Sequence, residues 1–167
     1  IIVSIPLNNQ AYDANGLSSY FGGPVPDATQ RISLNGKNYV SYAKELKAAV
    51  GNKGKIIVEI MNEANFDWNY PAWVNKQANE ETFQELFNII DTAAKNIHNQ
   101  AGSDVTVTTV LGDRPEHFGM ALKTNIDAVG INYYRHDDSL TPDINNAYTQ
   151  SGIRKSFYIA EAGQHSV

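Results

Sequence analysis

Short runs of β-branched and aromatic residues alternate along the chain with stretches in which apolar residues recur every three or four positions. The first pattern is typical of strands and the second of amphipathic helices. The strand-like runs are residues 1–7, 55–61, 104–111, 126–133 and 156–160. This alternation of strands and helices predicts an α/β fold with a parallel sheet covered by helices.

The clearest helix is predicted from Glu80 to about Gln100. Glu80 and Glu81 open it, which suits the positive end of the helix dipole. Its apolar stripe consists of Phe83, Leu86, Phe87, Ile90, Ala94 and Ile97. A second helix is predicted where Tyr39, Ala43, Leu46 and Val50 recur before Gly51, and shorter helices are expected after Pro115 and Pro142.

Two long stretches, residues 8–37 and 64–79, lack either periodicity. Each follows the carboxyl end of a predicted strand. Barrels and open sheets of the α/β class build their functional sites at these ends. Functional residues are therefore expected at the carboxyl ends of the strands.

The segment 56–63 is an apolar strand that ends in Asn62 and Glu63. A second apolar strand, beginning near residue 157, ends in Glu161. Two glutamates at the ends of nonadjacent strands of one barrel can face each other across a central cavity. Such a pair can hydrolyse a glycosidic bond, because one acid protonates the leaving oxygen while the other attacks or activates water.

The strand between them ends in Asn132, Tyr133 and Tyr134. A tyrosine hydroxyl there could hold a nucleophilic carboxylate ionised by donating a hydrogen bond to it. For one of the two tyrosines, simple packing in the core is the expected role.

These three strand ends together resemble the clan of retaining glycoside hydrolases with a (β/α)8 barrel, which carry catalytic glutamates on the fourth and seventh strands. Segment 56–63 is similar to the signature of glycoside hydrolase family 5, the cellulase and mannanase family, although Ala64 stands where that pattern usually has proline. Residues 160–163 resemble the seventh strand, and residues 130–133 the sixth.

The resemblance implies that Glu63 is the general acid/base and Glu161 the nucleophile of a double displacement. It further implies that Asn62 binds the sugar 2-hydroxyl and that Tyr133 supports Glu161. No cofactor or metal is implied. The expected partner is an oligo- or polysaccharide containing β-linkages.

The resemblance covers the third to seventh strands of the barrel. A complete barrel takes about 250 residues, whereas this chain has 167 and begins without methionine. We therefore expect residues 1–167 to form a single domain that is a fragment of a larger catalytic barrel. The alternative fold is an open, doubly wound sheet of five parallel strands, which fits the length well.

Aromatic residues crowd the stretch after Glu63, where both tryptophans of the chain, Trp68 and Trp73, are found. They are predicted either to stack on sugar rings or to pin a long loop to the barrel. Asn9, at the end of the first strand, and His165, shortly after Glu161, are further candidates for lining the cleft.

Composition narrows the function further. The net charge of −5 and the scattered lysines and arginines argue against nucleic acid or an anionic membrane as a partner. The absence of cysteine excludes a thiolate nucleophile, and no glycine-rich phosphate loop or metal-binding spacing is present. A polysaccharide substrate predicts a secreted, extracellular or periplasmic protein.

Two other functions share these residues. A non-catalytic carbohydrate-binding barrel would keep the cleft without turnover, and a transglycosylase would use the same glutamates with a sugar as acceptor.

Overall fold

The structure is a computed structural model of the 167-residue chain. It describes residues 2–5, 39–63, 65, 80–135 and 137–163. None of the helices in these ranges is long and apolar enough to cross a membrane.

Five parallel strands form one sheet in the order β1-β2-β3-β4-β5. The strands are β1 (Ile2–Ile5), β2 (Ile57–Ile60), β3 (Thr106–Gly112), β4 (Ala128–Tyr133) and β5 (Ser156–Ala162). The helices are α2 (Tyr39–Val50), α4 (Glu80–Ala101), α5 (Phe118–Leu122) and α6 (Leu140–Ser151), with 3-10 turns η3 (Gly51–Lys53) and η4 (Pro115–His117). The predicted strands and the long helix are confirmed, with boundaries shifted by a few residues.

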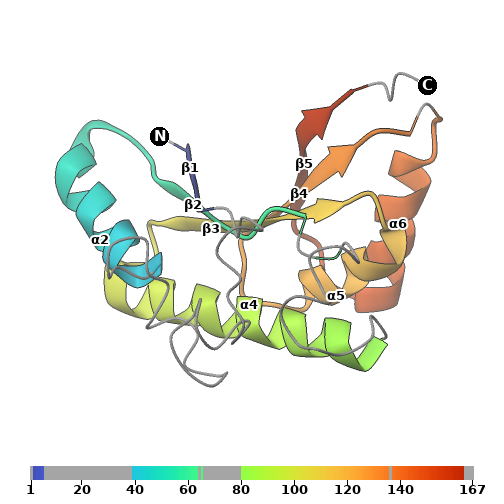
Figure 1. Cartoon of the computed structure of the whole chain (residues 1–167), viewed down its shortest axis with the longest axis horizontal. Coiled ribbons are helices and arrows are strands. Elements are labelled where there is room, and N and C mark those ends of the chain that lie inside the picture. Colours follow the sequence, from blue (N-terminus) through green and yellow to red (C-terminus); the bar gives the residue numbers. More distant parts are fainter. Residues whose placement is uncertain (1, 6–38, 64, 66–79, 136, 164–167) are drawn as a thin grey trace, which may run out of the picture.

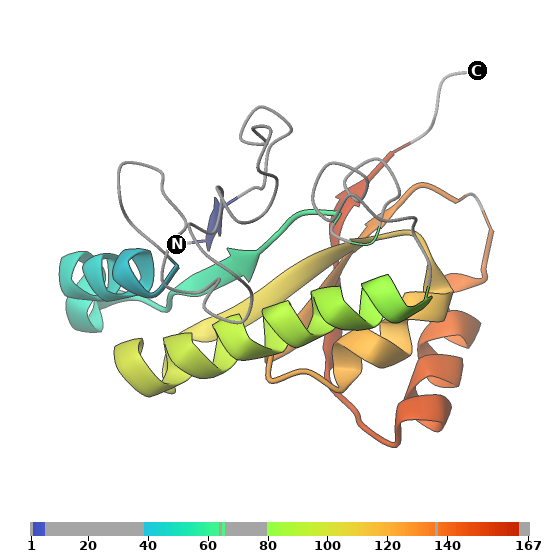
Figure 2. The ribbon, with the colours of Figure 1, turned by 60° about the horizontal axis from the view of Figure 1, so that its bottom comes forward.

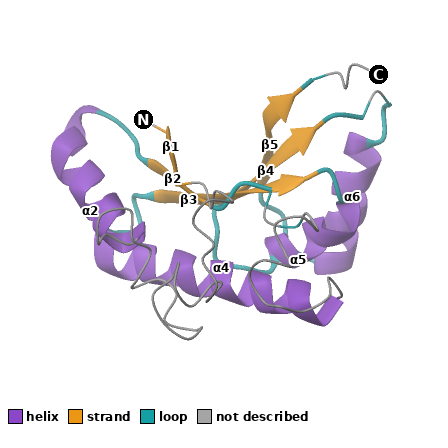
Figure 3. Cartoon of the chain, viewed as in Figure 1, coloured by secondary structure: helices purple, strands orange, loops and turns teal. Residues whose placement is uncertain are grey.

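Each strand lies next to its predecessor in the chain, and the four helices cover one face of the sheet (Figures 1 and 3). A doubly wound sheet would instead reverse its strand order and carry helices on both faces. The doubly wound alternative is therefore wrong. The sheet curves away from the helices (Figure 1), and the fold is that of a partial (β/α)8 barrel.

The hydrophobic core lies between the sheet and the helices. Figure 2 shows α4 running along the sheet, with α2 near one of its ends and α5 and α6 near the other. Every residue of the predicted stripe of α4 is buried in this core. The strand residues that face it include Val58, Ile60, Val107, Leu111, Val129 and Ile131. Burying each such side chain contributes about 1.5–3 kcal/mol.

The opposite face of the sheet, here called the concave face, carries small and polar residues. Gly130 of β4 pairs with Tyr158 of β5 and with Val110 of β3. A Cβ on Gly130 would lie 2.7 Å from the ring of Tyr158 and 2.8 Å from a methyl group of Val110. Glycine at this position lets the Tyr158 hydroxyl reach across β4 and donate to Thr108 Oγ1 at 3.1 Å.

Candidate active site

The backbone turns sharply where β2 ends, at the segment that carries Asn62 and Glu63. Met61 and Glu63 have positive φ angles of 63° and 51°. Residues other than glycine adopt such angles at a cost of about 1–3 kcal/mol each, and this strain concentrates at functional sites. Met61 is fully buried, whereas Asn62 and Glu63 are half-buried. The strained turn thus leaves the two polar side chains at the rim of the sheet.

Asn132 of β4 connects the two polar residues that follow β2. Its amide nitrogen donates to Glu63 Oε1 at 3.0 Å and lies 3.3 Å from Asn62 Oδ1. The Asn132 side chain is fully buried. The sequence marked this residue only as part of a polar strand end, because a contact across 69 positions leaves no local signal.

Glu161 receives a hydrogen bond from the neighbouring strand. The Tyr134 hydroxyl donates to Glu161 Oε2 at 2.6 Å. This hydrogen bond, followed by desolvation and by the charges of Glu161 and Glu63, raises the pKa of Tyr134 to about 12. The phenol therefore stays protonated at neutral pH and acts as a donor to a carboxylate. Because both glutamates act on one phenol, Tyr134 lies within electrostatic range of each.

A register shift in β5 places the Glu161 side chain on the concave face. Ile131 pairs with Ile159, but the next residue, Asn132, pairs with Glu161, so Ala160 is an extra residue in β5. Paired residues of parallel strands point to the same face, and a bulge of this kind reverses the facing of the residues that follow it. Glu161 therefore shares the concave face with Asn132, as its contact with Tyr134 shows.

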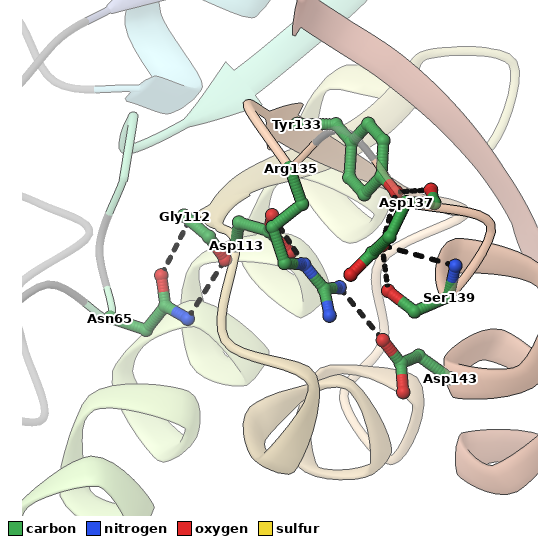
Figure 4. Close-up of polar contacts among 8 residues, drawn as sticks. All are labelled: Asn65, Gly112, Asp113, Tyr133, Arg135, Asp137, Ser139 and Asp143. Atoms are coloured by element: carbon green, nitrogen blue, oxygen red, sulfur yellow. Dashed lines mark hydrogen bonds and ion pairs between the residues drawn. The ribbon is translucent and has the colours of Figure 1, made fainter. Parts of the chain in front are cut away.

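The expectation that Tyr133 supports Glu161 is wrong. Tyr133 packs against the core, and its hydroxyl contacts the backbone oxygen of Asp137 and, at 3.0 Å, its Oδ1 (Figure 4). Burial, and then the Asp137 hydrogen bond, raises the pKa of Tyr133. Successive strand side chains alternate between faces, so Tyr133 points to the helices when Asn132 and Tyr134 point to the concave face. The tyrosine that donates a hydrogen bond to Glu161 is therefore Tyr134 and not Tyr133.

The structure thus brings Asn62 and Glu63 to Asn132, and Glu161 to Tyr134. Four other expected sugar-binding residues, Trp68, Trp73, Asn9 and His165, lie outside the described residues. Their roles stay predictions.

Asn65 anchors the chain just after Glu63. Its side chain is fully buried, and its Oδ1 accepts from the Gly112 backbone N–H at 2.7 Å. Its Nδ2 donates to the Gly112 carbonyl at 3.3 Å and lies 3.2 Å from His117 Nδ1. The ring of His117 in turn packs on Phe83, with centroids 4.0 Å apart. Asn65 therefore ties the Glu63 turn to the end of β3 (Figure 4).

Replacing Asn65 by alanine is expected to lower the free energy of unfolding by about 1–3 kcal/mol, because it removes the buried acceptor of the Gly112 backbone N–H. Chemical denaturation of both proteins measures the difference. Asn145→Ala, at an exposed position of α6, is the control and should change stability by no more than about 0.5 kcal/mol. Equal losses in the two variants would contradict the anchoring role.

Two further observations delimit the site. A hollow of about 360 Å³ opens between the start of α4 and the η4–α5 segment, but neither Glu63 nor Glu161 is among its described lining residues. Within the part of the chain that the structure describes, no group of three or more histidine, aspartate or glutamate side chains is placed to hold a metal ion.

Comparison with known proteins gives a structural match and none by sequence. No family model matches the chain, and no curated protein sequence is significantly similar to it. The solved structure of a fungal β-1,4-galactanase is similar in fold, with a TM-score of 0.50 and 15% sequence identity over 74% of this chain. The match spans 42% of the galactanase chain. It supports the barrel-type fold and gives no support to family 5 in particular.

Proposed function

We propose that this protein is a glycoside hydrolase that cleaves β-linked glycans by double displacement, with Glu63 as general acid/base and Glu161 as nucleophile. The arrangement at the end of β4 carries the proposal. From this one strand end, Asn132 binds Glu63 and Tyr134 binds Glu161. Two carboxylates held on one face of a barrel-type sheet are the groups that glycoside hydrolysis needs.

In the first step, the Glu161 carboxylate attacks the anomeric carbon while the Glu63 carboxylic acid protonates the departing glycosidic oxygen. In the second step, Glu63 removes a proton from water, which attacks the anomeric carbon and releases Glu161. Retention by this route requires carboxyl groups about 5–5.5 Å apart. Tyr134 supports the first step by donating a hydrogen bond to Glu161 Oε2, which orients the carboxylate.

Asn62 is suited to bind the sugar. Its Oδ1 lies 3.3 Å from the amide nitrogen of Asn132. Its own amide nitrogen makes no hydrogen bond to the described residues and can donate to a sugar hydroxyl. The galactanase with a similar fold makes a β-1,4-galactan the first substrate to test. We further propose that the protein acts outside the cytoplasm, where polymers of this kind are degraded.

Glu63→Gln is expected to slow hydrolysis of a β-1,4-galactan by about 10²–10⁴-fold, because the amide cannot protonate the leaving oxygen. An aryl β-galactoside with a nitrophenol leaving group needs little protonation, so formation of its glycosyl-enzyme should be slowed much less. Steady-state and burst kinetics on the two substrates measure this difference.

Glu116→Gln, at an exposed position of η4, is the matched control and should keep the wild-type rate on both substrates. An unchanged galactan rate in Glu63→Gln would exclude the acid/base role. Binding of galactan without cleavage by the wild-type protein would instead support the non-catalytic barrel. Products formed with an added acceptor sugar separate a transglycosylase from a hydrolase.

A further inference from the structure

The end of β4 presents different residues to its two sides. Asn132 and Tyr134 face the concave side and contact the two glutamates. Tyr133 and Arg135 face the helices and contact residues at the end of β3 and around the start of α6 (Figure 4). The residues that touch the catalytic pair are therefore interleaved with residues that anchor the strand end.

Arg135 makes two of these anchoring contacts through its guanidinium group. Its Nε donates to Asp113 Oδ2 at 2.7 Å, and a terminal nitrogen donates to Asp143 Oδ2, also at 2.7 Å. The guanidinium group lies 5.5 Å from the centre of the Tyr133 ring. Asp113 follows β3 directly, and Asp143 lies in the first turn of α6. Arg135 therefore joins the ends of two strands to a helix through charge-assisted hydrogen bonds.

The turn between β4 and α6 is closed by a second set of contacts. The Tyr133 hydroxyl contacts Asp137, whose Oδ1 accepts from the backbone N–H of Ser139 at 3.1 Å and from the Ser139 hydroxyl. Tyr134 therefore lies between Tyr133 and Arg135, which both contact residues of other elements or of the following turn. Its hydrogen bond to Glu161 lies at an exposed position, where such a bond contributes about 0.5–1.5 kcal/mol.

We propose that Arg135 is a positioning residue that holds the Tyr134 hydroxyl against Glu161 by fixing the end of β4 to β3 and α6. The inference deepens the proposed function, because Glu161 is the nucleophile of that reaction. Arg135 touches neither glutamate in the contacts of the described residues. Its effect passes through the backbone to the adjacent residue.

The ionisation of Tyr134 tests this proposal without any need for enzymatic turnover. The pKa of Tyr134 is raised to about 12, mainly by the hydrogen bond to Glu161. Labelling the tyrosines with ¹³C at Cζ allows each phenol to be titrated by NMR, and Tyr134→Phe identifies the signal.

In the wild-type protein about a tenth of Tyr134 should be ionised at pH 11, given its pKa of about 12. Arg135→Gln should release the phenol from Glu161, so that about nine tenths is ionised at the same pH. In Arg135→Lys the ionised fraction of Tyr134 at pH 11 should lie between these two values, because lysine keeps the charge and loses the planar fork of donors.

Arg154→Gln is the matched control. The Arg154 guanidinium lies 5.1 Å from the centre of the Tyr148 ring, so this variant removes a similar arginine–tyrosine contact elsewhere. It should leave the titration of Tyr134 unchanged.

A second variant covers the risk that Arg135→Gln does not fold. Asp113 Oδ1 is buried and has no hydrogen-bond partner among the described residues, so loss of Arg135 leaves a buried carboxylate uncompensated. The double variant Arg135→Met with Asp113→Asn removes the charges of Arg135 and of the more deeply buried carboxylate together, and leaves that of Asp143 in place. Its folding is checked by circular dichroism, and its Tyr134 should titrate as in Arg135→Gln.

A Tyr134 pKa that stays near 12 in a folded Arg135 variant would overturn the proposal. Failure of both variants to fold would also overturn it, because Arg135 would then serve stability alone. The outcome is separable from the proposed function: an inactive wild-type protein with the expected Tyr134 shifts would refute the hydrolase and keep the positioning role. In an active enzyme, Arg135→Gln should lower kcat with little change in KM.

Discussion

Glu161→Gln is expected to lower turnover of a β-linked glycan by about 10⁴-fold or more, while glycan binding stays close to that of the wild-type protein. Glutamine has nearly the shape of glutamate and can still accept the Tyr134 hydrogen bond at its side-chain oxygen. Its neutral amide is not a nucleophile, so no glycosyl-enzyme ester forms. Loss of a nucleophile has effects of this size in other covalent enzymes.

The experiment compares turnover by product release with binding by calorimetry. Glu81→Gln, at an exposed position in the first turn of α4, should keep wild-type turnover and serves as the control. A 2-deoxy-2-fluoro-galactoside with a good leaving group should trap a covalent adduct on Glu161, seen as a mass increase of the peptide that contains it. Substantial turnover by Glu161→Gln, or an adduct on another residue, would refute the assignment of the nucleophile.

Phe118→Ala is expected to lower the free energy of unfolding by about 3–5 kcal/mol. Phe118 begins α5, is fully buried, and packs on Phe157 of β5 with ring centroids 5.6 Å apart. The substitution opens a cavity between the helices and the sheet, where the core of this fold lies. For a chain of this length the loss corresponds to a decrease in Tm of roughly 6–20 °C.

Tyr158→Phe is the comparison on the concave face. It removes the hydrogen bond to Thr108 and leaves the ring in place, so it should cost only about 0.5–1.5 kcal/mol. Thermal and denaturant unfolding of the two variants measure how stability is divided between the faces. Comparable losses would contradict a core confined to the helix side.

Much of the secondary structure could be predicted because its signals are local. The apolar stripe of α4 repeats with the period of a helix, and the complete stripe is buried. The five apolar runs that become β1 to β5 were likewise recognisable from their composition. Strand order was not, because a sequence with alternating strands and helices suits both a doubly wound sheet and a barrel. Only the sequential pairing decided between them.

By itself the sequence determined which residues could do chemistry: Glu63 and Glu161 were recognisable as acids at strand ends. The tertiary structure decided how they are held. The extra residue at Ala160 turns Glu161 to the concave face. Because side chains alternate along β4, it is Tyr134 and not Tyr133 that contacts Glu161. Both outcomes depend on the register between strands and on which face the helices cover. These are properties of contacts between distant segments, so no local pattern of residues encodes them.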